Sequence, residues 1–102
     1  MRIDNAGLVE EADKVHDIVK ASLQEAARGN RLPPQIRRTF DVEFDEDWNG
    51  DLAVWVWLHI TDGRNPAPED VKRLLALTSG IRDELIDAKL RHWPYVDVRP
   101  GP

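Results

Sequence analysis

The acidic segment from Asp45 to Asp51 is the first candidate for chemistry, because its spacing begins like that of a calcium-binding loop. Oxygen-bearing side chains occupy alternate positions and a glycine stands at the sixth: Asp45, Asp47, Asn49 and Gly50. A loop of this kind needs a bidentate glutamate at its twelfth position and a helix on either side. Val56 stands at the twelfth position, and the flanking residues alternate like strands. The segment is therefore predicted to be an acidic turn that holds no metal.

Carboxylates that could do acid–base chemistry precede this turn. Asp41, Glu43 and Asp45 occupy alternate positions, so they would share one face of a strand. Glycoside hydrolysis requires two carboxylates placed across a cleft, one of them with a raised pKa. Carboxylates along a single strand are typical of a solvated face instead, and we expect no catalytic pair here.

The histidines and serines show no catalytic or metal-binding spacing. His16, His59 and His92 have no second strong ligand four residues away in a pattern typical of zinc. Ser22 and Ser79 fall in predicted helices without a nucleophile-elbow motif. The glycines form no phosphate-binding loop. The protein is therefore predicted not to be an enzyme and to bind no metal or cofactor.

Residues 52–61 carry the most informative pattern in the chain. The even positions from Leu52 to Ile60 are aliphatic, whereas the odd positions include Trp55, Trp57 and His59. Alternate side chains of a strand point to opposite faces. One face is therefore predicted to join the core, and the other to carry aromatic rings with polar tips. The functional question is whether another chain covers this second face, or an internal segment such as the C-terminal tail.

Length and composition predict one domain over residues 1–102. The chain contains no cysteine and has a formal net charge of −5, so a disulfide framework is excluded and a reducing cytoplasm is compatible. The sequence has no apolar run of signal-peptide or transmembrane length, and a cytoplasmic protein is expected. The acidic balance disfavours strong non-specific binding to nucleic acid. Basic residues that could still form a local patch are Arg28, Arg31, Arg37, Arg38, Arg82, Lys89, Arg91, His92 and Arg99.

Helical and strand periodicities alternate along the chain. The predicted elements are a helix over residues 5–28, strands over 36–45 and 52–61, a helix over 68–89, and a strand over 95–98. This order, α-β-β-α-β, predicts an α+β fold in which two helices pack on one face of a three-stranded sheet. Gly29 is the expected C′ residue of the first helix. Gly80, inside the second helix, costs about 1 kcal/mol against alanine, so a kink or a close backbone contact is expected there.

The second helix has a predicted inward face as well. Its members recur at helical spacing: Val71, Leu74, Leu75, Thr78, Ile81, Leu85 and Ala88.

The Asn49–Gly50 pair predicts a hairpin between the first two strands, and the turn length decides which faces match. A two-residue loop would pair Phe44 with Trp55 and Val42 with Trp57. This register places the carboxylates on the same face as the aliphatic side chains. A three-residue loop with Gly50 left-handed would pair Phe44 with Val54 and Val42 with Val56. This register gathers the aliphatic side chains and both phenylalanines on one face. We expect the second register, with the tryptophans beside Asp41 and Glu43.

The C-terminal part of the sequence resembles the ribosome-binding factor A family. The similar stretches are Gly80-Ile81-Arg82-Asp83-Glu84-Leu85 and Leu90-Arg91-His92-Trp93-Pro94-Tyr95-Val96. The resemblance implies a KH-like (type II) fold and a role in RNA binding during ribosome assembly. Its implied RNA contacts are Gly80, Arg82, Lys89 and Arg91. This chain departs from the family in its acidic charge. It also has Ile81 directly after Gly80 in the sequence, where the family usually has one residue between the two.

These observations favour a non-catalytic interaction module that binds another protein, or a second copy of itself, through the outer sheet face. The predicted partner-binding residues are Trp55, Trp57, His59, Asp41 and Glu43. An antitoxin-like or adaptor role is consistent with a short acidic chain. The alternative is the KH-like RNA-binding function that the resemblance implies.

Overall fold

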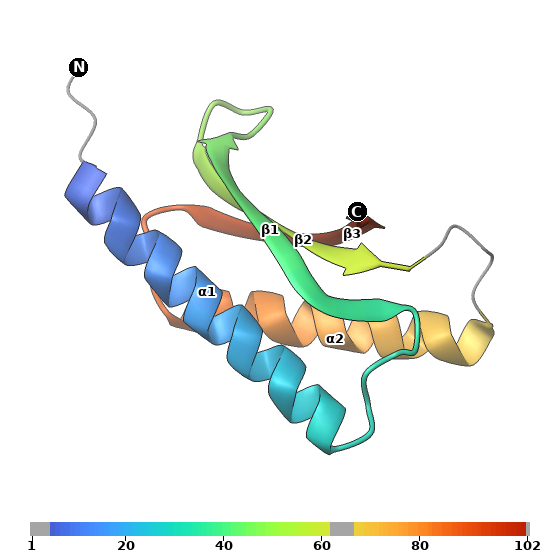
Figure 1. Cartoon of the computed structure of the whole chain (residues 1–102). Helices are drawn as coiled ribbons and strands as arrows, with labels where there is room; N and C mark the ends of the chain where they lie inside the picture. Colours follow the sequence, from blue (N-terminus) through green and yellow to red (C-terminus); the bar gives the residue numbers. More distant parts are fainter. Residues whose placement is uncertain (1–4, 62–66, 102) are drawn as a thin grey trace.

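The computed structural model describes residues 5–61 and 67–101. The elements, in order, are α1 (Asn5–Arg28), β1 (Ile36–Glu46), β2 (Leu52–Ile60), α2 (Pro68–Asp87) and β3 (Trp93–Pro100). The three strands form one sheet in the order β1-β2-β3, in which β1 is antiparallel to β2 and β3 is parallel to β2. The predicted α+β architecture and element order are confirmed, and both helices lie on the same side of the sheet (Figure 1).

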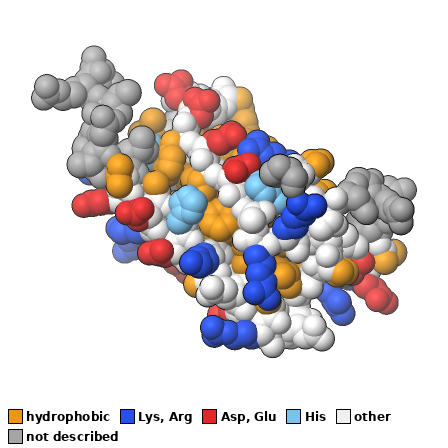
Figure 2. Space-filling view, viewed as in Figure 1, with side chains coloured by type: hydrophobic (Ala, Val, Ile, Leu, Met, Phe, Trp, Pro, Cys, Tyr) orange, Lys and Arg blue, Asp and Glu red, His pale blue; other side chains and the backbone are white. Residues whose placement is uncertain are grey.

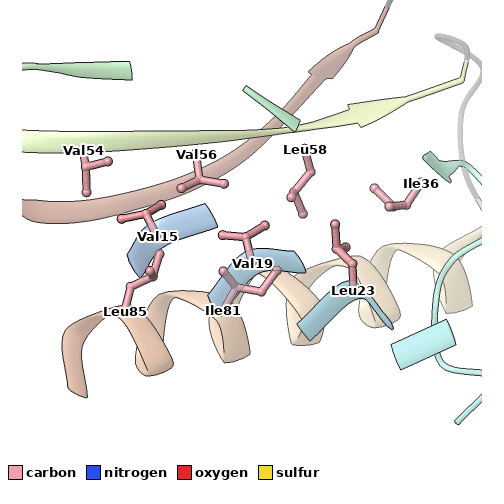
Figure 3. Close-up of a cluster of buried hydrophobic side chains, with 9 residues drawn as sticks. All are labelled: Val15, Val19, Leu23, Ile36, Val54, Val56, Leu58, Ile81 and Leu85. Carbon is pink, nitrogen blue, oxygen red and sulfur yellow. The ribbon is translucent and has the colours of Figure 1, made fainter. Parts of the chain in front are cut away.

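The core lies between the helices and the inner face of the sheet. It is made of side chains that are at most 6% exposed: Val15, Val19, Leu23, Ile36, Val54, Val56, Leu58, Ile81 and Leu85. Figure 3 shows the strand residues pointing toward those of the two helices. Burying each such side chain contributes roughly 1.5–3 kcal/mol. The aliphatic positions of β2 therefore face inward, as the alternation predicts.

The predicted hairpin register is also confirmed. Val42 pairs with Val56 and Glu43 with Trp55, and the same register continues without a shift from Phe40 to Glu46. Gly50 has a φ of 81°, a left-handed conformation that a residue without Cβ adopts at little cost. The Asp47 carboxylate accepts backbone N–H bonds from Asn49 and Asp51 at 2.9 and 3.0 Å. The acidic turn is thus held by its own backbone.

The first strand bends where Arg38 interrupts its apolar pattern. Ile36 pairs with Ile60 but Phe40 pairs with Leu58, so β1 carries extra residues between these two pairs. The bulge returns the Ile36 side chain to the core despite the intervening polar residues.

The end of α1 differs from the prediction by one residue. Asn30, not Gly29, adopts the left-handed conformation, with a φ of 57°. The N–H of Arg31 donates to the Ala26 carbonyl at 2.8 Å and that of Asn30 to Ala27 at 3.2 Å, which is the bonding pattern of a Schellman motif. Asparagine tolerates this conformation better than most residues, so it takes the role predicted for glycine.

The prediction for Gly80 is wrong. The helix α2 runs through it without interruption (Figure 1), and a Cβ built there would meet no heavy atom within 4 Å outside its own helical backbone and neighbours. The helix also ends at Asp87, before the predicted Lys89. Its inward face is narrower than expected, because Val71 and Leu75 are exposed, whereas Leu77 packs against the core. β3, by contrast, is longer than predicted.

A buried carboxylate joins the two ends of the fold. Glu11 of α1 is 8% exposed. Its carboxylate accepts a hydrogen bond from the backbone N–H of Arg91 and lies 2.7 Å from Nδ1 of His92. The His92 ring meets Phe44 edge to face with centroids 4.9 Å apart. This contact fixes the α2–β3 loop against α1 and β1.

Candidate functional site on the outer face of the sheet

Aromatic side chains gather on the sheet face opposite the helices. Tyr95 of β3 is the register partner of Trp55 on β2, and their rings stack with centroids 4.3 Å apart and planes 16° apart. The Trp57 ring continues the stack at 5.8 Å from that of Trp55, inclined by 9°. We call Tyr95, Trp55 and Trp57 the aromatic column. The predicted aromatic stripe is confirmed, and a tyrosine from the neighbouring strand extends it.

Arg99 closes one end of the aromatic column. Its guanidinium carbon lies 5.2 Å from the Trp57 ring centroid, a cation–π geometry. The guanidinium also donates to Asp41 at 2.5 Å and to Glu43 at 3.2 Å. Glu43 accepts a further bond from the Trp57 indole N–H at 3.3 Å. Arg99, Glu43, Asp41 and the Trp57 indole are therefore joined in one network.

Charge pairing shifts the pKa values of Asp41 and Arg99 at the Trp57 end of the aromatic column. The hydrogen bond from Arg99, followed by that from His59, holds the pKa of Asp41 below its ordinary 3.8. In return, Asp41 and then Glu43 raise the pKa of Arg99. Both effects favour the ionised forms, so the pair stays charged over the neutral pH range.

His59 lies beneath the C-terminal tail. Its side chain belongs to the outer face, yet the residue is only 5% exposed. Nδ1 lies 2.8 Å from the Thr39 hydroxyl and Nε2 lies 2.9 Å from the Asp41 carboxylate. Gly101 passes so close that an added Cβ would approach the His59 Cβ to 2.7 Å. The tail therefore covers His59, and this residue positions Asp41 rather than offering a surface of its own.

The other end of the aromatic column is exposed. Trp48, from the turn, lies 5.5 Å from the Tyr95 ring and is inclined to it by 52°, and it is 75% exposed. Trp93 precedes Tyr95 by two residues on β3 and therefore belongs to the same face; it is 52% exposed. Leu52, at the start of β2 and of the same parity as its inward-facing residues, is 55% exposed at the same end of the sheet. The most accessible apolar surface of the outer face thus lies at the hairpin end.

Tyr95 and Asp47 connect the aromatic column to the acidic turn. The Tyr95 hydroxyl donates to the Asp47 carboxylate at 3.0 Å. Partial burial, the hydrogen bond and the negative charge of Asp47 together raise the pKa of Tyr95 above 10.0. Partial burial opposes ionisation of Asp47, but the donors from Asp51, Asn49 and Tyr95 outweigh it and lower the pKa of Asp47. The turn is consequently charged and fixed against Tyr95.

The residues implied by the family resemblance do not form one surface. Gly80 lines a cavity of about 370 Å³ between α1 and α2, together with Arg73. Arg91 instead lines a different cavity at the α2–β3 loop. Arg82 is exposed on α2, and Lys89 follows that helix with a φ of 54°. Glu25 and Glu84 add negative charge to the cavity at Gly80.

Four residues of this face were not among the predicted contacts: Trp48, Trp93, Tyr95 and Arg99. Three of them lie on β3 at alternate positions, which is the signal that could have placed them on one face. Their proximity to Trp55 and Trp57 depends on the parallel pairing of β3 with β2, which the β3 sequence alone does not indicate. Trp48 lies in the turn, where alternation gives no guidance.

In the part of the chain that the structure describes, no group of three or more His, Asp or Glu side chains is arranged to hold a metal ion. No helix among the described residues is long and apolar enough to cross a membrane. Neither a known protein family, nor a curated protein, nor a solved structure matches the chain. The resemblance to the ribosome-binding factor A family therefore stays a prediction.

Proposed function

We propose that this chain is a non-catalytic interaction module that binds another protein through the outer face of its sheet. The observation that carries the proposal is the arrangement of the aromatic column with Trp48 at its exposed end, on the face that the helices leave open. Tryptophan and tyrosine are enriched in protein interfaces and are prominent among the residues that dominate binding energy. Each such ring presents up to about 150–250 Å², enough for several to form a contact patch.

The ring geometry favours a protein partner over single-stranded nucleic acid. Bases bind proteins by stacking on exposed aromatic faces. Trp55 already stacks with Tyr95 and Trp57 within the chain, so less of its ring surface is available to a base. Asp41 and Glu43 beside the aromatic column would also repel phosphate. A protein surface, which contacts ring edges as readily as faces, is the better match.

Charge also favours a different protein over a second copy of this chain. Carboxylates outnumber the single arginine around the aromatic column: Asp41, Glu43 and Asp47 surround it, against Arg99. Two such faces brought together would place like charges opposite each other, which opposes association. An adaptor-like or antitoxin-like role follows the same chemistry, because both act by occupying a partner's surface.

The test compares two exposed apolar positions on opposite sides of the molecule. Trp48→Glu alters the outer face, whereas Leu75→Glu makes the same change on α2, where the leucine is 61% exposed. Tagged wild-type chain and both variants are used to capture partners, with mass spectrometry, nuclease treatment and a sizing measurement. We expect a protein retained by the wild type and Leu75→Glu to be lost at least tenfold with Trp48→Glu, while circular dichroism shows unchanged helix content.

Three results would contradict the proposal. Equal capture by both variants would remove the outer face from the contact. Capture that disappears on nuclease treatment would favour RNA binding, the function implied by the family resemblance. Sizing that shows a dimer broken by Trp48→Glu, with no other protein bound, would replace the partner with a second copy.

A further inference from the structure

A cavity of about 620 Å³ opens beside the exposed end of the aromatic column. Its walls come from three segments that are far apart in the sequence: the acidic turn, the last turn of α2 with the following loop, and the start of β3. The lining residues that matter here are Asp47, Asp51, Leu52, Ile86, Leu90 and Trp93. This volume is in the range of about 300–1,000 Å³ that is usual for ligand pockets.

The cavity wall has an apolar surface that the fold leaves open. Leu52, Ile86 and Trp93 line it and are each at least 36% exposed. Tyr95 also lines the cavity, and the exposed Trp48 ring lies 5.5 Å from the Tyr95 ring. Four of the seven large apolar side chains that are exposed in residues 5–61 and 67–101 therefore lie at this one end. Clustered apolar exposure of this kind marks contact sites more often than isolated exposure does.

The charge around this apolar surface is negative. Asp47 and Asp51 line the cavity, and Asp45 and Glu46 are exposed just before them in the sequence. Figure 2 shows Asp and Glu side chains gathered over the β1–β2 hairpin at the top of the view. Arg91 contributes the cationic side chain of the lining. Because these carboxylates surround an apolar hollow, a partner that fits must combine an apolar side chain with positive charge.

We infer that this cavity receives an apolar side chain from a lysine- or arginine-containing segment of the partner protein. The apolar side chain packs between Leu52, Ile86 and Trp93. Neighbouring cationic side chains approach Asp51 and the exposed ring of Trp48, where a guanidinium or ammonium gains a cation–π contact. This inference rests on the proposed function and names the chemistry of the segment that is bound.

A display library of random twelve-residue peptides tests the inference directly, because it needs only the chain itself as bait. Selection on the wild-type chain is expected to enrich peptides with Leu, Ile, Met or Phe flanked by Lys or Arg. The strongest peptide is then synthesised together with a version in which every Lys and Arg is replaced by Gln. We expect the replacement to weaken binding at least tenfold, measured by tryptophan fluorescence. An acidic consensus, a consensus without charge preference, or no enrichment would each overturn the inference.

Variants of the chain then locate the peptide. Ile86→Arg introduces a long cationic side chain into the cavity wall, and Leu75→Arg makes the same change on α2 away from it. We expect Ile86→Arg to weaken binding at least tenfold and Leu75→Arg to have less than a twofold effect. The pair Glu46→Gln with Asp51→Asn leaves the apolar wall in place and should weaken binding at low salt and flatten its salt dependence. Equal binding by Ile86→Arg and Leu75→Arg would exclude the cavity.

The same variants separate this inference from the proposed function. If Trp48→Glu abolishes capture of the partner while Ile86→Arg leaves both capture and peptide binding intact, the outer face is the binding surface and the cavity is not. If neither variant affects capture, the proposed function itself fails.

Discussion

The two ends of the aromatic column differ in how many of their groups already have partners within the chain. At the Trp57 end, Arg99 covers the ring and pairs with Asp41 and Glu43, while His59 lies buried under the C-terminal tail. At the Trp48 end, the ring is inclined against Tyr95 and most of it is exposed. The same sheet face thus has one end whose groups are paired within the chain and one end that leaves a large aromatic ring mostly exposed.

This difference indicates which residues stabilise the fold and which remain for a partner. A group that already has its hydrogen bonds loses them if a partner takes its place, so it gains little from binding. An exposed tryptophan loses only water. We therefore place the contact at Trp48 and Trp93 and assign a structural role to Trp57 and His59, although the alternation in β2 makes Trp55, Trp57 and His59 look equivalent.

The largest expected difference between the ends is in stability. Trp57→Ala removes a stacked ring, its indole hydrogen bond and the support of Arg99, and should lower the free energy of unfolding by about 2 kcal/mol. Trp48→Ala removes an equally large ring whose surface is mostly in water, and should change it by less than about 0.5 kcal/mol. Urea unfolding of both variants measures the contrast. Equal losses would show that the two ends are not distinct.

A smaller effect is expected from the buried imidazole. His59→Ala leaves Thr39 and Asp41 without their ring partner beneath the tail, and should lower the free energy of unfolding by about 1 kcal/mol. His16→Ala is the matched control, because His16 is exposed on α1 and meets Phe40 at 5.0 Å between ring centroids. The His16→Ala change should lower the free energy of unfolding by less than about 0.5 kcal/mol. An unchanged free energy of unfolding for His59→Ala would mean that the contact between the tail and His59 does not stabilise the Trp57 end of the aromatic column.

The smallest effect is on the acid side of the pH profile. The pKa of Asp41 is lower in the folded chain than its ordinary 3.8. The stabilisation from its ionised form is therefore complete above about pH 4 and disappears as the pH falls through the lowered folded value. We expect thermal unfolding midpoints of the wild type to decrease more on acidification to about pH 3 than those of Asp41→Asn. Asp17→Asn, an exposed change on α1, should leave the acid dependence as in the wild type.

Local sequence patterns were sufficient for the β1–β2 hairpin and its two faces. Gly50 and the alternation on both sides of the turn determined the register, because only one pairing puts Phe40, Val42 and Phe44 with the aliphatic side of β2. The interruption at Arg38 coincided with the bulge. Since these features depend on neighbouring residues, they could be predicted before the tertiary structure was in hand.

The properties that depend on distant segments could not be predicted. The burial of His59 results from the passage of Gly101 over its ring, and the two residues are not neighbours in the sequence. Leu52 continues the aliphatic pattern of β2, yet it is exposed because it faces the cavity rather than the core. Gly80 lacks the close contact expected of it because α1 leaves a cavity at that point of α2. Each outcome depends on where one element ends relative to another.

The contact between Glu11 and His92 has a consequence for the order of folding, since 81 residues separate the two. The helix α1 is synthesised first, but its inward carboxylate has no partner until the segment before β3 has been made, and burying an unpaired carboxylate is unfavourable. The N-terminal half of α1 should therefore dock late, after the hairpin and α2 are in place. A nascent or truncated chain would lack the loop that forms one wall of the cavity, so the proposed binding site is complete only once the whole fold has formed.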